Sequence, residues 1–316
     1  MLWYWSTLFQ IVLITIVFNL NCATRATEPT KKPPKLSSYS DLKPYVFSRP
    51  PSLKIFNKNG PFEFQKVEDF EIRVSKEEVV NTDIFYASHK DKSPLVIFQH
   101  GNLAHKGVHR YQAERIASWG MHAMIISQPN KGRWIKNGKT LAKLIRLINA
   151  WPELLDHRID PSNIIVAGHS FGGSALAIAA GTRTPIKGAI FLDPALVDKK
   201  VKRYIKKIDI PIIVLGADRR VFKSRHRSDF YKLVKKNAIE ISVLNSTHND
   251  AQFPQLFSFS QIIGLEHSPT PHRQKRFAAA IAASAFSLAS TGSNTYAWNS
   301  FQTEIKKGTL INPKRK

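Results

Sequence analysis

Short apolar runs alternate with amphipathic or alanine-rich stretches along most of this chain. Between residues 62 and 86, apolar positions are interleaved with polar ones, a pattern typical of antiparallel strands with one exposed face. Residues 95–98 form a continuous apolar run, which is typical of a strand buried on both faces. The same signature predicts further strands at 122–126, 163–167, 186–192, 210–216 and 238–244.

The stretches between these runs predict helices. Residues 139–155 carry leucine and isoleucine at helical spacing, while residues 174–180 and 273–289 are rich in alanine, the strongest helix former. Two more helices are expected at 109–118 and 222–236. Strands that alternate with helices at this rhythm predict an α/β fold, with a mostly parallel central sheet covered by helices on both faces.

The first 26 residues have the character of a targeting segment. They are almost wholly apolar up to Leu20 and then small and polar, which predicts a secretory signal peptide cleaved after Ala23 or Ala26. Because the segment lacks the basic amino-terminal region of a typical signal peptide, an uncleaved membrane anchor is the alternative interpretation. Cys22, the only cysteine, resembles the lipid-modified cysteine of bacterial lipoproteins. Export without disulfides favours a secreted or periplasmic bacterial envelope protein.

The remaining composition divides the chain further. Residues 27–55 are rich in proline and lysine and are interpreted as a tether. The α/β domain is expected to span 56–292, followed by a basic C-terminal tail at 293–316. We expect the protein to be a monomer.

Charge is the main oddity of the composition. With 47 Lys and Arg against 23 Asp and Glu, the formal net charge is +24. Such a charge favours contact with anionic surfaces, among them membranes and bacterial envelope polymers, although a solvated basic surface without a partner would carry the same signature. The sequence contains no nucleic-acid-binding motif, so we expect no nucleic-acid partner.

The clearest chemical signal is Gly168-His169-Ser170-Phe171-Gly172-Gly173, between a predicted strand and a predicted helix. A serine at the apex of such a turn, with glycines two residues before and two after it, is the nucleophile elbow of α/β-hydrolases. The glycines are needed because neighbouring backbone passes close to the strained serine. Ser170 is therefore the candidate nucleophile.

A serine nucleophile needs a base and an orienting acid. His248 follows the last predicted strand and is the candidate base; His267 and His272 lie further downstream beside prolines. Asp193 and Asp218 end two successive predicted strands, and both remain candidates for the acid. The chain order of serine, acid and histidine is that of α/β-hydrolases.

Two backbone N–H groups are expected to bind the oxyanion of the reaction. One belongs to Phe171, directly after the serine, and the other to Asn102, which follows His100-Gly101 at the end of the run at 95–98. Trp134 is either a wall of the acyl site or a packing cap. This chemistry requires neither metal nor organic cofactor, and the histidines lack ligand spacing.

The elbow, together with Leu192-Asp193-Pro194-Ala195 and the segment Thr247–Phe253, resembles platelet-activating factor acetylhydrolases of the plasma type. In these acetylhydrolases, as in chlorophyllases and pancreatic-type lipases, the acid of the triad follows the strand that ends here at Leu192. These resemblances therefore imply that Asp193 is the acid. The chain is also similar to cutinase-like, dienelactone hydrolase-related enzymes, which would imply Asp218. Both resemblances imply the α/β-hydrolase fold.

The activity that the resemblances imply is hydrolysis of carboxylic esters with lipid-like or short acyl groups. The alternatives are a polyester or amide hydrolase of the same fold, and a non-catalytic protein of this fold that binds anionic surfaces.

Overall fold

The computed structural model describes residues 51–219, 226–254 and 268–316. The proposed signal peptide, Cys22, most of the tether and His267 lie outside the described residues. All described residues belong to one compact unit, Lys32–Lys316.

The apolar runs form one sheet, which has nine strands within the described residues, in the order β1-β2-β4-β3-β5-β6-β7-β8-β9. From β4 to β8 neighbouring strands are parallel, whereas β1, β2 and β9 join the edges antiparallel. The strands are β1 (Phe64–Ser75), β2 (Glu78–Ala87), β3 (Ser93–Gln99), β4 (His122–Ser127), β5 (Ile159–His169), β6 (Gly188–Leu192), β7 (Ile212–Ala217), β8 (Ala238–Val243) and β9 (Leu310–Arg315).

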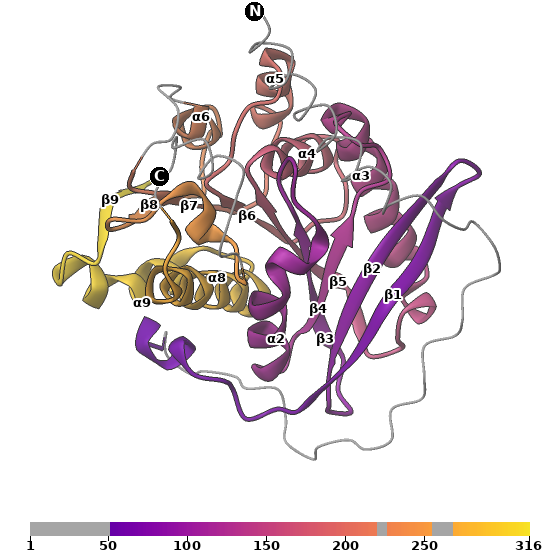
Figure 1. Ribbon diagram of the computed structural model, residues 1–316, viewed down its shortest axis with the longest axis horizontal. Helices are drawn as coiled ribbons and strands as arrows, with labels where there is room; N and C mark the ends of the chain where they lie inside the picture. The colour runs from indigo at the N-terminus through magenta and orange to yellow at the C-terminus, as the bar shows by residue number, and fades with distance from the viewer. Residues whose placement is uncertain (1–50, 220–225, 255–267) are drawn as a thin grey trace, which may run out of the picture. The chain divides into compact units, whose positions relative to one another are not determined.

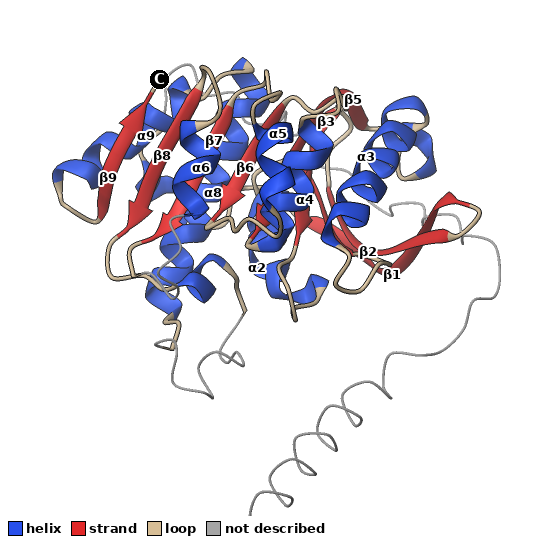
Figure 2. Ribbon diagram, turned by 90° about the horizontal axis from the view of Figure 1, so that it is seen from above, coloured by secondary structure: helices blue, strands red, loops and turns tan. Residues whose placement is uncertain are grey.

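Helices cover both faces of the sheet, as Figures 1 and 2 show. Residues of α3, α4, α5 and α6 share one buried apolar cluster with one sheet face, and residues of α2, α8 and α9 share a second cluster with the other. The helices are α2 (Arg110–Ser118), α3 (Trp134–Ala150), α4 (Phe171–Ala180), α5 (Lys202–Ile205), α6 (His226–Lys232), α8 (Pro271–Thr291) and α9 (Thr295–Lys306). Short 3₁₀ helices are η1 (Leu53–Asn57), η2 (Lys106–His109), η3 (Pro152–Leu154), η4 (Lys199–Val201) and η5 (His248–Ala251).

Local sequence explains where the longest helix begins and ends. Thr270 caps α8 by accepting a hydrogen bond from the N–H of Arg273, and Pro271 occupies the first turn, where its missing N–H costs nothing. Gly292 ends the helix with a left-handed backbone of φ 58°, which glycine adopts without strain. The alanines of α8 are buried against the sheet, so helix and strands can approach closely.

The predicted α/β-hydrolase fold class is confirmed, and the main difference lies at the C-terminal end. Residues 293–316, expected as a basic tail, contain α9 and the edge strand β9. Phe301 and Leu310 are buried in the core, and β9 pairs antiparallel with β8. The apolar residues of these short segments are interleaved with polar ones and give too weak a pattern for sequence reasoning, but Ala297, Phe301 and Leu310 attach both elements to the core.

Candidate active site

The turn around Ser170 has the strained geometry that the elbow motif predicts. Ser170 has φ 53° and ψ −124°, a backbone conformation that non-glycine residues rarely adopt, between the end of β5 and the start of α4. A Cβ at position 168 would lie 2.7 Å from the carbonyl oxygen of Gly172, and one at position 172 would lie 2.4 Å from that of His100. Both glycines are therefore required by close backbone contacts.

Asp193 and His248 form a short hydrogen bond. Nδ1 of His248 lies 2.6 Å from Oδ2 of Asp193, and their side chains are only 21% and 16% exposed. The other carboxylate oxygen of Asp193 accepts a hydrogen bond from the N–H of Ala217. Burial alone would raise the pKa of Asp193, but the hydrogen bond to His248, the charge of that imidazole and the Arg227 guanidinium hold this pKa well below its usual range. Asp193 is therefore ionised throughout the neutral range.

Hydrogen bonds of neighbouring residues bring Ser170 to this pair. The N–H of Ser170 donates to the carbonyl of Leu192, one residue before Asp193, at 3.1 Å. His169, one residue before Ser170, lies 3.0 Å through its Nε2 from the carbonyl oxygen of His248. The rings of His169 and His248 are 4.4 Å apart between centroids. Ser170, Asp193 and His248 thus follow the carboxyl ends of β5, β6 and β8, and residues next to Ser170 and Asp193 link these three segments.

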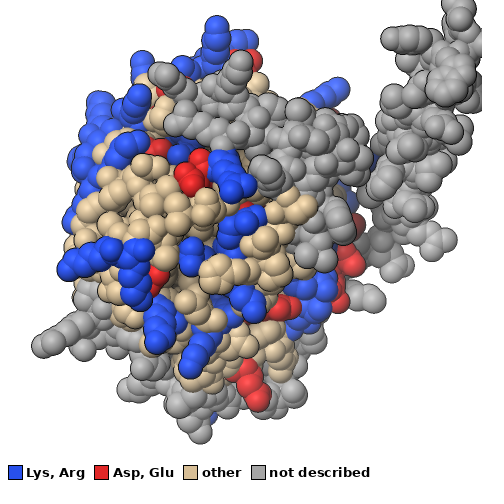
Figure 3. Space-filling model, turned by 60° about the vertical axis from the view of Figure 1, so that its left-hand side comes forward, with Lys and Arg blue, Asp and Glu red and all other residues tan. Residues whose placement is uncertain are grey.

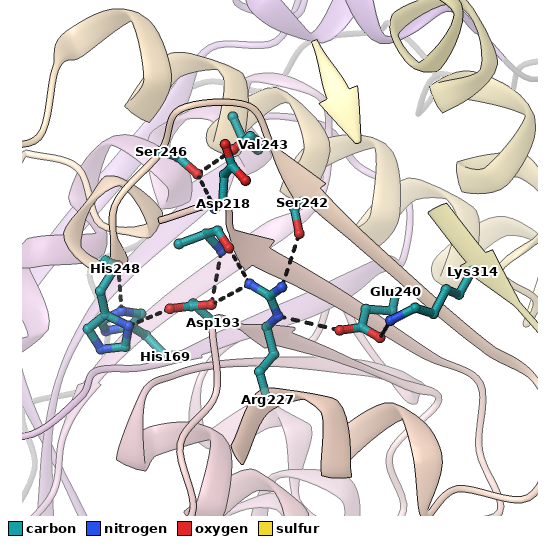
Figure 4. A network of polar contacts seen from close by, with 11 residues as sticks. His169, Asp193, Asp218, Arg227, Glu240, Ser242, Val243, Ser246, His248 and Lys314 are labelled. Atoms are coloured by element: carbon teal, nitrogen blue, oxygen red, sulfur yellow. Dashed lines mark hydrogen bonds and ion pairs between the residues drawn. The ribbon is translucent and has the colours of Figure 1, made fainter. Parts of the chain in front are cut away.

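Asp218, the alternative acid, contacts a different part of the loop after β8. Its Oδ2 accepts a hydrogen bond from the N–H of Asn245 at 2.9 Å, and its own N–H donates to Oγ of Ser246. Figure 4 shows Asp193 between His248 and Arg227, whereas Asp218 lies at the turn formed by residues 243–246. Asp218 braces the start of the segment that carries His248.

The two amides expected to bind the oxyanion come from adjoining segments. A Cβ at Gly101 would lie 2.8 Å from Cβ of Ser170, so the loop carrying Asn102 is packed directly on the elbow. Within the described residues, no hydrogen bond from the N–H of Asn102 or of Phe171 to another group of the protein is found.

Trp134 is buried beside these amides rather than exposed in a loop. Its ring centroid lies 6.1 Å from those of Phe171 and His100, and its indole N–H is 3.4 Å from Oδ1 of Asn102. Its exposed fraction is only 5%. Trp134 therefore packs the loop that carries the candidate amide. It also lines a hollow of about 400 Å³, together with residues 132–136, Lys139, Val197 and Asp198.

Sequence reasoning missed the residues that hold the histidine loop. His169 lies inside the elbow motif; its Nδ1 accepts a hydrogen bond from the amide Nε2 of Gln252 at 2.7 Å, which leaves the proton on Nε2 to donate to the carbonyl of His248. Burial, and then the charges of His248 and His109, hold the pKa of His169 well below 6.5, so this imidazole stays neutral.

Asp250 ties the same loop to α8. It is completely buried and accepts hydrogen bonds from the N–H groups of Thr247 and Thr270, and its Oδ2 lies 2.7 Å from Nε of Arg273. The three residues Thr247, Thr270 and Arg273 fix the direction in which the loop leaves β8. The downstream rival His272 is exposed in the first turn of α8 and hydrogen-bonds Arg276.

No group of three or more His, Cys, Asp and Glu side chains is arranged to hold a metal ion within residues 51–219, 226–254 and 268–316. In the same part of the chain, no helix combines the length and apolarity needed to cross a bilayer.

A strained serine between a parallel strand and a helix, with an Asp–His pair at the ends of later strands of the same sheet, defines an α/β-hydrolase. Comparison with known proteins agrees: residues 130–265 match the family described as platelet-activating factor acetylhydrolase, isoform II. That segment contains Ser170, Asp193 and His248.

Similar proteins include cutinases of Thermobifida. Cutinase 1 of Thermobifida cellulosilytica is 28% identical over 166 residues, which is 51% of this chain and 60% of that protein. Cutinase est1 of Thermobifida alba is 25% identical over 201 residues, 60% of this chain and 64% of that protein. The chain thus matches less than two thirds of the length of these relatives. It has the α/β-hydrolase fold and resembles both the acetylhydrolase family and cutinases.

Proposed function

We propose that the protein is a serine hydrolase that cleaves carboxylic esters by a Ser170–His248–Asp193 triad. The observation that carries this proposal is the 2.6 Å hydrogen bond between His248 and Asp193, next to a serine held at φ 53°. An ionised aspartate on Nδ1 keeps the proton of a neutral imidazole on that nitrogen, so that Nε2 carries no proton and can accept one from serine. The likeness to an acetylhydrolase family and to cutinases supports an ester as the substrate.

The reaction follows from these roles. His248 Nε2 takes the hydroxyl proton of Ser170 while Oγ attacks the ester carbonyl carbon. The N–H groups of Phe171 and Asn102 bind the resulting oxyanion, and the imidazolium returns the proton to the departing alcohol. Water then repeats the sequence on the acyl-enzyme and releases a carboxylic acid. Lipid-like or short acyl groups are the proposed substrates, and no cofactor takes part.

An active-site label tests this function directly. Reaction with a fluorophosphonate probe is expected to label the wild-type protein, and Ser170→Ala is expected to abolish both labelling and hydrolysis of a p-nitrophenyl ester series. Ser174→Ala is a matched control, because this serine lies on α4, one turn after Ser170, and its hydroxyl donates to the carbonyl of Ala195 in the loop after β6. A well-folded protein that neither reacts with the probe nor cleaves any ester of the series would refute the enzyme and support the non-catalytic alternative.

The basic surface supports a second part of the proposal, contact with anionic lipid or envelope surfaces. On the face shown in Figure 3, Lys and Arg side chains clearly outnumber acidic ones. The C-terminal elements contribute exposed Lys306, Lys307, Arg315 and Lys316. Attraction of this kind adds roughly 1 kcal/mol for each cation near an anionic bilayer.

Vesicle sedimentation can test this contact. Binding to phosphatidylserine-containing vesicles is expected to exceed binding to neutral phosphatidylcholine vesicles at least tenfold and to fall with added salt. Lys306→Glu with Lys307→Glu should weaken it strongly. The same change at Lys90 and Lys92, exposed in the turn between β2 and β3, should have a smaller effect. Equal binding to both kinds of vesicle would overturn the surface-binding part and leave the esterase proposal untouched.

A further inference from the structure

Arg227, on the short helix α6, reaches the side of Asp193 that faces away from His248. Its Nη1 lies 3.0 Å from Oδ1 of Asp193, while Oδ2 of the same carboxylate bonds His248. The same Nη1 also donates to the carbonyl of Ala217. The Arg227 side chain is 18% exposed, so its charge is only partly screened by water. Asp193 is thus clamped between a histidine and an arginine (Figure 4).

Residues of β8 and β9 hold the guanidinium in this place. Its Nε lies 3.4 Å from Oε1 of Glu240, and its Nη2 lies 3.2 Å from Oγ of Ser242. Glu240 is 3% exposed and pairs through its other oxygen with Nζ of Lys314 at 2.7 Å. Ion pairs therefore run without a break from the edge strand β9 to Asp193, as Figure 4 shows.

Gly216 provides the space for this arrangement. A Cβ at position 216 would lie 2.2 Å from Nη1 and 2.4 Å from Cζ of Arg227, closer than any real contact. Glycine is unfavourable inside a strand, because it loses more conformational freedom than other residues and packs no side chain. The close approach of the guanidinium explains the presence of Gly216 near the carboxyl end of β7.

We propose that Arg227 is a positioning residue of the triad, which fixes the Asp193 carboxylate and sets the pH at which His248 takes up a proton. This inference rests on the proposed function. An isolated carboxylate at 2.6 Å would strongly favour imidazolium, whereas a cation on its far oxygen offsets part of that attraction. His248 consequently stays neutral, and able to act as a base, at lower pH than it would beside Asp193 alone.

The other described residues near His248 add no unpaired charge to those of Asp193 and Arg227. Among the described residues, His169 from the end of β5 packs against the imidazole with its ring tilted by 39°, but it is itself neutral because its pKa is well below 6.5. Asp250, two residues along the loop, is paired with Arg273. Of the contacts that residues 51–219, 226–254 and 268–316 make with the pair, the ion pair of Arg227 with Asp193 brings an outside charge directly against it.

Two variants test the proposal by different routes. Arg227→Met removes the charge, and Gly216→Ala keeps it but occupies its place with a methyl group. Alanine fits the extended backbone of β7, and the group that must move is the end of a flexible side chain, so Gly216→Ala should fold even if Arg227→Met does not. For both we expect the acid limb of the kcat/KM profile to move up by about half a pH unit or more, with a lower plateau.

Lys202→Met is the matched control. It removes a cation that pairs with Asp229 on the same helix α6, at 3.1 Å, and it should leave the acid limb in place. If Gly216→Ala folds and its acid limb stays within about 0.2 pH units of wild type, or moves down, the proposal is overturned. A loss of stability alone would not move this midpoint.

Titration of His248 by NMR separates this inference from the proposed function. The imidazole signal, assigned with His248→Gln, reports protonation whether or not the protein hydrolyses esters. If no ester is cleaved but Gly216→Ala still raises the midpoint of His248, the function fails and the electrostatic role of Arg227 stands. If esters are cleaved and the midpoint does not change, the function stands and the role of Arg227 is refuted.

Discussion

His248 turns its Nδ1 to Asp193 at 2.6 Å, whereas Asp218, one strand further along the sheet, accepts a hydrogen bond from the backbone of Asn245. The two aspartates follow the carboxyl ends of the adjacent parallel strands β6 and β7, and the carboxylate of each accepts hydrogen bonds there. Only one of them faces the imidazole.

This contact predicts unequal effects of removing the two carboxylates. Asp193→Asn should lower kcat about 10⁴-fold, because asparagine presents the wrong partner to Nδ1 and favours the wrong tautomer of the base. Asp218→Asn should leave kcat within about tenfold of wild type. Steady-state kinetics on one p-nitrophenyl ester would check both, and the reverse ranking would refute the assignment of Asp193.

Loss of the His169 imidazole should lower kcat without affecting substrate binding. His169→Leu removes the hydrogen bond to the carbonyl of His248, so the base loses its fixed position; we expect kcat to fall about ten- to hundredfold with little change in KM. His122→Leu is the control, since His122 is equally buried but bonds the N–H of Ala87. Equal losses of kcat in both variants would show that only stability is affected.

Asp250 should matter for stability. Asp250→Ala leaves the Arg273 guanidinium and two backbone N–H groups without their acceptor, and breaking a buried ion pair in this way costs about 3 kcal/mol of unfolding free energy or more. Urea unfolding measures the change. Lys307→Met, which removes an exposed pair with Glu304, should cost well under 1 kcal/mol. Similar midpoints for the two variants would contradict the anchoring role of Asp250.

Buried histidines should make the fold sensitive to acid. Burial lowers the pKa of His109 to about 3, with a smaller contribution from His100. The unfolded state then binds a proton near pH 6.5 that the folded state refuses, so stability is full above that pH and declines as pH falls toward 3.

The slope of unfolding free energy against pH gives the test. Each such histidine contributes up to about 1.4 kcal/mol per pH unit. Between pH 5 and 6.5, His109→Phe should make this slope less steep by close to one proton, even if the variant is less stable overall. A slope that does not respond to His109→Phe would show that this imidazole titrates normally in the folded state.

The hydrophobic pattern and the elbow motif determined the fold class and the position of the candidate nucleophile. Both depend on local information: the apolar run before Ser170, the alanines after it and the glycines on either side fix strand, turn and helix whatever the rest of the chain does. The C-terminal elements escaped prediction because α9 and β9 form only against the sheet that the earlier strands build.

The choice between Asp193 and Asp218 belongs to the tertiary structure, because both ends of neighbouring strands look alike in sequence and only the path of the loop after β8 decides which one meets His248. Only the tertiary structure also brings Arg227 to Asp193, because the two residues lie far apart along the chain. The one sequence signal for this contact is Gly216, a glycine inside a buried strand. Contacts between distant segments depend on how their side chains pack against one another, and this packing cannot be deduced from the sequence alone.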